Sequence, residues 1–191
     1  MKVFTHYSVE ALANTFLVAP NEAGAAIMVD PGVLDVPLLK IIEDRGYYVK
    51  HILVTHPEEM NLRGIRTIMR VYDATIHAAT PRVVSFPADR VEDGDRLYLD
   101  GFEVEVISVP SYLRDAVVYR INHVLFPGRV LSAGIIGEVA NPYVRSLLVG
   151  LVRRKILTLP PETLVFPFLG PPTTIGLETE TNPDLTRPIV R

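Results

Sequence analysis

Apolar and polar positions in the first third of the chain repeat with two different periods. Short apolar runs that are rich in β-branched side chains and bounded by Pro, Asn, Asp or Gly are typical of strands. Between these runs, apolar residues recur at helical spacing, and Asp35 followed by Pro37 is a helix-start signal. The pattern predicts strands at 14–18, 25–30, 51–55 and 74–78, and helices at 36–45 and 62–72.

The second half alternates apolar and polar positions and contains hairpin signals. Asp100-Gly101 is a two-residue hairpin signal, and Asn122-His123 separates another pair of apolar segments. Strands are predicted at 96–99, 102–107, 117–121, 124–126 and 164–166. Asn141 opens a predicted helix that runs to Ile156. Its predicted inward stripe consists of Val144, Leu147, Leu148, Leu151 and Val152.

These elements predict one domain. The chain has 191 residues, a length that suits a single core. Both halves contain sheet and helix, with no linker between them, which favours sheet packed on sheet with helices outside. We therefore expect a single domain over 1–191, with an irregular C-terminal tail from about residue 177.

Composition and charge exclude several classes of protein. Hydrophobic residues make up 48% of the chain and charged residues 21%, which excludes bulk disorder. The formal net charge of −3 does not favour nucleic acid or anionic lipid as a partner. The N-terminus does not resemble a signal peptide, and no segment is long and apolar enough to span a membrane. We expect a cytoplasmic protein with no nucleic-acid or membrane partner.

The supply of metal-binding side chains is small. The chain has no Cys and five His, which removes disulfides, thiolate nucleophiles and Cys-type metal sites. Any transition-metal site must therefore be built from histidines and carboxylates.

Several loop sequences, taken in order, carry a resemblance to a known family. Asp-Pro-Gly stands at 30–32, and Thr-His at 55–56 is followed by Gly64. Leu-Phe-Pro-Gly stands at 125–128, and Val-Phe-Pro-Phe-Leu-Gly-Pro-Pro-Thr-Thr-Ile-Gly at 165–176. The remaining matching segments are 14–18, 106–110, 116–119 and 181–183. Together they resemble the metallo-β-lactamase superfamily, especially its glyoxalase II-like hydrolases, over nearly the whole chain. The resemblance implies an α/β fold (α+β in some schemes), a four-layer αββα sandwich.

The metal ligands that this family uses are mostly replaced. The resemblance places the four ligand or catalytic positions of the family's metal loop on His56, Glu58, Met60 and Asn61. It places a later histidine on Tyr112, the bridging aspartate on Arg129 and the last histidine on Leu169. Of these seven positions, His56 alone carries the expected residue.

The replacements do not suit a hydrolytic zinc pair. Such a pair needs neutral imidazoles and carboxylates around the ions. Met60 and Leu169 do not coordinate zinc usefully, and a guanidinium such as that of Arg129 stays charged at any working pH. We predict no metal cofactor. Arg129 is expected to pair with Glu58 or Glu59 where metal and carboxylates lie in the family.

Two functional hypotheses follow from these positions. The first is a non-catalytic protein of this fold, a pseudoenzyme that acts in binding or assembly or holds a small molecule in the family's active-site cleft. The alternative is a hydrolase of esters, thioesters or related small substrates with a rebuilt site. That site would use weakly bound zinc at His56, Glu58 and Glu59, or a metal-free acid–base pair of Glu58 with Tyr112.

A homodimer is a further possibility. Val149 is expected outside the main stripe of the helix at 142–156, and Ile135 and Ile136 add apolar surface. Exposed apolar patches often mark interfaces, although core packing explains the same residues.

Overall fold

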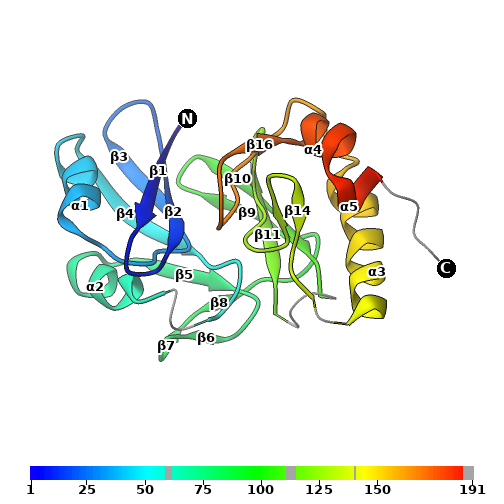
Figure 1. Cartoon of the computed structure of the whole chain (residues 1–191). Helices are drawn as coiled ribbons and strands as arrows, with labels where there is room; N and C mark the ends of the chain where they lie inside the picture. Colours follow the sequence, from blue (N-terminus) through cyan, green and yellow to red (C-terminus); the bar gives the residue numbers. More distant parts are fainter. Residues whose placement is uncertain (59–61, 111–114, 140, 187–191) are drawn as a thin grey trace. The chain divides into compact units, whose positions relative to one another are not determined.

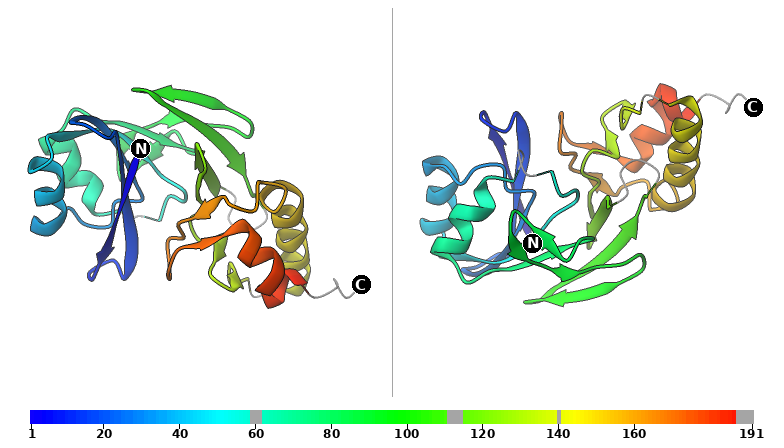
Figure 2. Two further views of the ribbon diagram at one scale, coloured as in Figure 1. Left: turned by 90° about the horizontal axis from the view of Figure 1, so that it is seen from above. Right: turned by 90° about the horizontal axis from the view of Figure 1, so that it is seen from below.

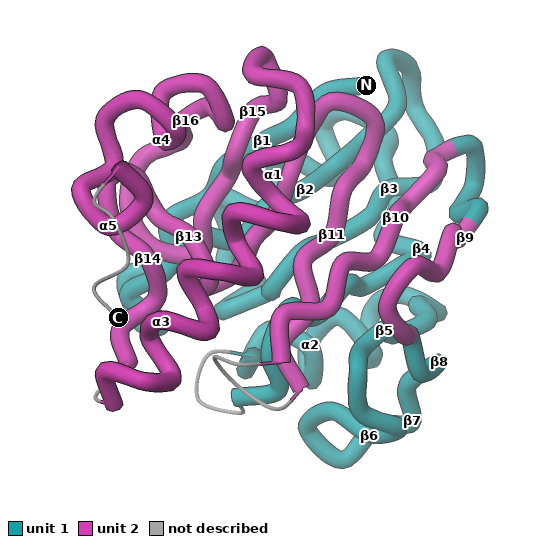
Figure 3. Tube along the Cα trace, turned by 90° about the vertical axis from the view of Figure 1, so that its right-hand side faces the viewer, with its two compact units in different colours: residues 1–91, 98–101 teal, residues 92–97, 102–191 magenta. Residues whose placement is uncertain are grey.

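The computed structural model describes residues 1–58, 62–110, 115–139 and 141–186, and the chain divides into two compact units. Unit 1 contains Met1–Val91 and Tyr98–Gly101, and unit 2 contains Glu92–Leu97 and Phe102–Arg191. Figures 1 and 3 show the elements and the two units. The expectation of a single domain over 1–191 stays a prediction.

A six-stranded sheet forms the centre of unit 1, in the order β1-β2-β3-β4-β5-β8. Strands β1 to β3 pair antiparallel, and β3, β4, β5 and β8 pair parallel. The strands are β1 (Lys2–Ser8), β2 (Ala13–Ala19), β3 (Gly24–Val29), β4 (Tyr47–Leu53), β5 (Thr75–Ala78) and β8 (Asp89–Arg90). A small hairpin joins β6 (Arg82–Val83) to β7 (Phe86–Pro87).

Two helices pack against this sheet. Helix α1 (Val36–Glu43) begins as predicted, because the Asp35 side chain accepts a hydrogen bond from Leu38 N at 3.0 Å. Buried Leu38 and Ile42 from α1 share one core cluster with Ile65 and Ile68 from α2 (Gly64–Val71) and with sheet residues. Hydrophobic spacing predicted both helices, and their shared core explains why they lie against the strands.

A second six-stranded sheet has the order β16-β15-β12-β11-β10-β9. Its strands are β9 (Arg96–Leu99), β10 (Phe102–Ser108), β11 (Val117–Ile121), β12 (Val124–Phe126), β15 (Leu164–Val165) and β16 (Thr173–Thr174). The hairpin predicted at Asp100-Gly101 joins β9 to β10, with φ of 45° and 92° at these residues. Positive φ at both central residues is what this turn requires, and Gly101 adopts it at no steric cost.

Unit 2 is completed by a short hairpin and by helices. The hairpin pairs β13 (Leu131–Ser132) with β14 (Ile135–Ile136). Helix α3 (Pro142–Leu151) is capped by the Asn141 side chain and continues into a π-helix, η2 (Val152–Ile156). Figure 2 shows α4 (Ile175–Thr181) and α5 (Pro183–Thr186) near α3, and Arg145 of α3 binds Asp184 of α5 at 2.6 Å.

Two predictions about these elements are wrong, and one strand was not predicted. The tail is not irregular from residue 177, because the Thr174 side chain caps α4, and α5 follows. The inward stripe of α3 is rotated by about one position, so Leu147 is 44% exposed, while Val149 is buried. Strand β1 was not predicted. It is an edge strand that is only partly buried, and its polar residues, such as Lys2 and His6, interrupt the apolar pattern that predicts a strand.

No helix within the described residues is both long enough and apolar enough to cross a membrane.

Candidate functional site

The metal-loop region of unit 1 is built on a buried carboxylate. Asp30 follows β3 and is 1% exposed. Its Oδ1 accepts a hydrogen bond from Thr55 N at 2.8 Å, and its Oδ2 accepts one from the Thr55 hydroxyl at 2.6 Å. Asp30 therefore ties the end of β3 to the loop after β4.

Asp30 has both a backbone role in the Asp-Pro-Gly turn and a side-chain role. Asp30 does adopt φ of 47°, and its backbone carbonyl accepts a hydrogen bond from the Thr15 hydroxyl at 3.0 Å. The same hydroxyl oxygen accepts a hydrogen bond from Gly32 N at 2.9 Å. Its carboxylate, however, is directed to Thr55, so Asp30 fixes the loop that carries His56.

His56 is held by Thr55 in a defined orientation. Its ring is 2% exposed, and its Nδ1 lies 2.8 Å from Thr55 Oγ1. The Thr55 hydroxyl has one hydrogen and donates it to Asp30, so Nδ1 of His56 must carry the hydrogen that Thr55 Oγ1 accepts. In the neutral ring, Nε2 is then the nitrogen with a lone pair, the atom that would bind a metal or act as a base.

The start of α2 explains the glycine of the metal-loop motif. Gly64 N donates to the carbonyl oxygens of Pro31 and Gly32 at 3.2 and 2.9 Å. A Cβ at Gly64 would lie 2.8 Å from the Pro31 carbonyl oxygen. The Thr-His…Gly spacing therefore has a packing reason that is independent of metal binding.

Among the residues that the structure describes, the other family positions of this region do not join His56 in a metal-binding group. The Glu58 side chain is exposed. Glu59, Met60 and Asn61 lie outside the described residues, as does Tyr112. Within the part of the chain that the structure describes, no group of three or more His, Cys, Asp or Glu side chains is placed to hold a metal ion.

Unit 2 contains the two remaining positions. Arg129 follows the buried Leu-Phe-Pro-Gly segment, and its guanidinium carbon lies 5.1 Å from the centre of the Phe168 ring. Phe168 N also donates to the Gly128 carbonyl at 3.0 Å, which joins the loop of Arg129 to the loop of Leu169. Leu169 itself is 42% exposed. The predicted pairing of Arg129 with Glu58 or Glu59 stays a prediction, since Glu58 belongs to unit 1 and Glu59 is not described.

A cavity of about 430 Å³ lies beside Arg129 and is lined by residues of unit 2. Arg129 and Leu169–Pro171 form part of its lining, and the hairpin segment between 132 and 138 forms the rest. Ile135, Ile136 and Leu169 make much of this lining apolar. The volume is within the range of small-molecule sites.

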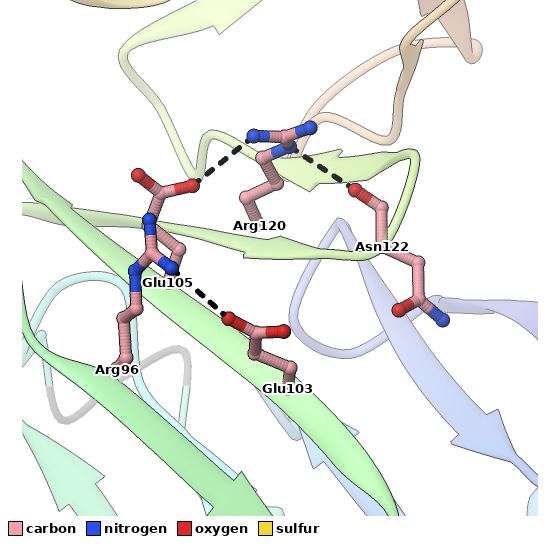
Figure 4. A pocket seen from close by; sticks show the side chains of 5 residues that line it. All are labelled: Arg96, Glu103, Glu105, Arg120 and Asn122. Atoms are coloured by element: carbon pink, nitrogen blue, oxygen red, sulfur yellow. Dashed lines mark hydrogen bonds and ion pairs between the residues drawn. The ribbon is translucent and has the colours of Figure 1, made fainter.

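A second, smaller pocket of about 240 Å³ lies on one face of β9, β10 and β11, and Figure 4 shows its lining. Arg120 Nη1 donates to Glu105 Oε2 at 3.2 Å, and Arg96 Nη1 donates to Glu103 Oε1 at 3.5 Å. Arg120 Nε also donates to the Asn122 carbonyl at 3.1 Å. The two arginines and two glutamates that line this pocket form ion pairs with one another on a largely exposed surface. Such pairing is expected of a solvated strand face rather than of a ligand site.

Two histidines outside the metal positions form a cluster in unit 1. His51 Nδ1 lies 3.2 Å from His77 Nε2, and His51 Nε2 lies 2.7 Å from Asp100 Oδ2. Lys50 also bonds Asp100, at 2.8 Å. Burial and the neighbouring His51 lower the pKa of His77 from 6.5 to about 4, against an opposing effect of Asp89. The contact joins β4 to β5, so residues 26 positions apart in the sequence form this cluster.

Comparisons with known proteins identify the fold. No family model matches the chain. The hydroxyacylglutathione hydrolase of Methylobacillus flagellatus is 30% identical over 131 residues, which are 68% of this chain and 52% of that protein. The hydroxyacylglutathione hydrolase of Salmonella arizonae is 26% identical over 160 residues, 83% of this chain and 62% of that protein. The crystal structure of BLEG-1 B3 metallo-β-lactamase matches with a TM-score of 0.86 at 23% identity, over 97% of this chain and 100% of that one.

The predicted resemblance to the metallo-β-lactamase superfamily and to its glyoxalase II-like group is thereby confirmed. The predicted fold class, a mixed α/β fold of the metallo-β-lactamase type, is confirmed as well. The chain spans between one half and two thirds of the length of these two curated relatives.

Proposed function

We propose that this chain, which has the metallo-β-lactamase fold, is a non-catalytic protein of that fold that acts in binding or assembly. One observation carries the proposal. Of the three family ligand positions in unit 2, the two that the structure describes hold Arg129 and Leu169, and Arg129 lies over the Phe168 ring beside a cavity. Neither side chain supplies a donor for a metal ion.

The donor set does not fit the metal pair that the fold family implies. Arg129 stands at the position assigned to the bridging aspartate. Its guanidinium is permanently positive, whereas a group that bridges two metal cations must be negative. Like charges within a few ångströms repel strongly where water is excluded. Leu169 in place of the last histidine removes another donor. We therefore derive no catalytic step through a metal.

The retained loops have structural reasons to persist. Asp30 and Gly64 secure the ends of β3 and the start of α2 through hydrogen bonds and close packing. The cavity beside Arg129 gives the proposed binding role a place for a small molecule. The shape of these loops is therefore explained by their roles in the fold and in a binding site, and a hydrolytic reaction is not needed to explain it.

A second candidate is a hydrolase with a rebuilt mononuclear or metal-free site. The hydrogen bond from His56 Nδ1 to Thr55 favours it, because this bond leaves His56 Nε2 as the acceptor nitrogen of the neutral ring. That nitrogen would act as a base or as a single metal ligand.

One experiment separates the two functions. The purified chain is assayed on thioester, lactone and phosphodiester test substrates, alone and with added zinc, manganese or iron(II), beside a His56→Ala variant. The proposal expects equal background hydrolysis by both proteins under every condition. Hydrolysis above background that disappears in His56→Ala would contradict it and would support the rebuilt hydrolase.

A further inference from the structure

We propose that the cavity of unit 2 binds a small monocarboxylate with an apolar body. This inference rests on the proposed binding function and specifies its ligand. The lining combines one cation, Arg129, with apolar walls from Ile135, Ile136 and Leu169.

Arg129 provides recognition of a carboxylate. A guanidinium is planar and always charged, and two of its N–H groups match the two oxygens of a carboxylate. The Phe168 ring, 5.1 Å from the guanidinium carbon, restrains the orientation of Arg129. Because the guanidinium is restrained before a ligand arrives, less conformational entropy is lost on binding.

The walls provide affinity for an apolar body. Ile135 is 60% exposed and Leu169 is 42% exposed, although both are large aliphatic residues. Both line the cavity, so an apolar ligand would remove their surface from water. Removing apolar surface from water in this way favours binding. The cavity volume of about 430 Å³ accommodates a ligand of moderate size.

The hairpin wall is held in place by the C-terminal helices. Gly134 N donates to both oxygens of Glu178, at 3.2 and 3.1 Å, and Ile136 N donates to Asp184 Oδ2 at 3.2 Å. Glu178 is 1% exposed and also accepts hydrogen bonds from Thr173 Oγ1 at 2.8 Å and Asn182 Nδ2 at 2.7 Å. A wall fixed by two carboxylates is preorganised, as a specific ligand site requires.

Glu138 sets the number of charges that the ligand carries. Its exposed carboxylate also lines the cavity. A second anionic group on the ligand would add negative charge to a lining that already contains Glu138 and whose only cation among the described residues, Arg129, binds the first carboxylate. The site therefore selects a monocarboxylate over a dicarboxylate of the same length.

The test uses octanoate as the probe, with neutral octanamide and the dicarboxylate suberate as matched compounds, and measures binding to the full chain by calorimetry and by NMR shifts. We expect saturable octanoate binding at one site, and at least ten-fold weaker binding of octanamide and suberate. Arg129→Gln should weaken octanoate binding at least ten-fold. Arg154→Gln removes an exposed arginine that does not line this cavity, and it should leave octanoate binding unchanged.

A second variant guards against loss of folding in Arg129→Gln. Ala133→Phe places a ring at a half-buried cavity residue, and it should abolish octanoate binding while the thermal midpoint stays within a few degrees. Equal binding of octanoate and octanamide, or full octanoate binding by Ala133→Phe, would overturn the inference. No octanoate binding at millimolar concentration would overturn it too. The proposed function is tested separately, because this measurement involves neither hydrolysis nor metal.

Discussion

The two units support the family's ligand positions in different ways. In unit 1, Asp30 and Thr55 hold His56 through hydrogen bonds of 2.6 to 2.8 Å, whereas the other three positions carry Glu58, Met60 and Asn61. In unit 2, the two described positions carry Arg129 and Leu169, and a backbone hydrogen bond from Phe168 N to the Gly128 carbonyl joins their loops. The comparison shows that the hydrogen bonds that support a loop can be present where the metal ligands are not. The bonds of Asp30 to Thr55 have a second role, because they also hold the fold together.

A buried carboxylate ties down a loop in each unit, which makes the comparison testable. Asp30 ties β3 to the loop after β4, and Glu178 ties α4 to the β13–β14 hairpin. Neither acid is one of the seven metal-ligand positions. Their removal should therefore affect stability and shape rather than a reaction.

The largest effect is expected for Asp30→Ala. The substitution leaves Thr55 N–H, which is buried, without the carboxylate oxygen 2.8 Å away. Removing one partner of buried polar groups is costly, and we expect a loss of about 4 kcal/mol in the free energy of unfolding. Urea denaturation measures this loss, with Asp44→Ala as an exposed acidic control in the same unit. A loss below about 1 kcal/mol would show that the network does not hold unit 1 together.

Glu178→Ala should have the next largest effect. It removes the acceptor for Gly134 N, Thr173 and Asn182, and we expect a loss of about 3 kcal/mol. The NMR signals of the hairpin at 131–136 should broaden or shift as well, because its C-terminal support is gone. Glu180→Ala, an exposed position on the same helix, is the matched control. A hairpin spectrum identical in both variants would contradict the supporting role of Glu178.

The smallest effect concerns pH and His77. Burial lowers its pKa to about 4, so between pH 6.5 and 4 the unfolded chain binds a proton that the folded chain does not. Stability contributed by neutral His77 is therefore fully present above pH 6.5 and falls as the pH decreases, by about 2 kcal/mol between pH 6.5 and 5. His51 and Asp89 act electrostatically on His77, and Asp100 bonds to His51.

The difference between variants isolates the contribution of His77. His77→Gln should flatten the dependence of unfolding free energy on pH in this range, whereas His123→Gln, an exposed turn residue of unit 2, should leave it unchanged. If His77→Gln keeps the full slope, then the pH dependence comes from other groups.

Hydrophobic periodicity was sufficient to predict most strands and helices of both units. It failed for α3 and its π-helical continuation η2, where the buried positions are Leu148 and Val149 in α3 and Val152 and Ile156 in η2. The last turn of this helix is a π-helix, and its wider turn changes which side chains face the core. It also failed after residue 177, because polar residues such as Glu178 look solvent-exposed until a partner 44 positions away is known.

The candidate site could be predicted in part. Resemblance located His56, Arg129 and Leu169, and these positions define the argument about metal binding. The role of Asp30 toward Thr55, the cavity beside Arg129 and the contact of His51 with His77 depend on segments distant in sequence. No local pattern in the sequence encodes such contacts.

Metal content is the most direct test of the central claim. The purified chain is dialysed against zinc, then against metal-free buffer, and its zinc is measured per chain beside a variant with Arg129→Asp, Tyr112→His and Leu169→His. We expect the natural chain to retain far less than one zinc ion per chain, and we expect the triple variant to retain more zinc than the natural chain. One tightly held zinc per natural chain, lost in His56→Ala, would contradict the account.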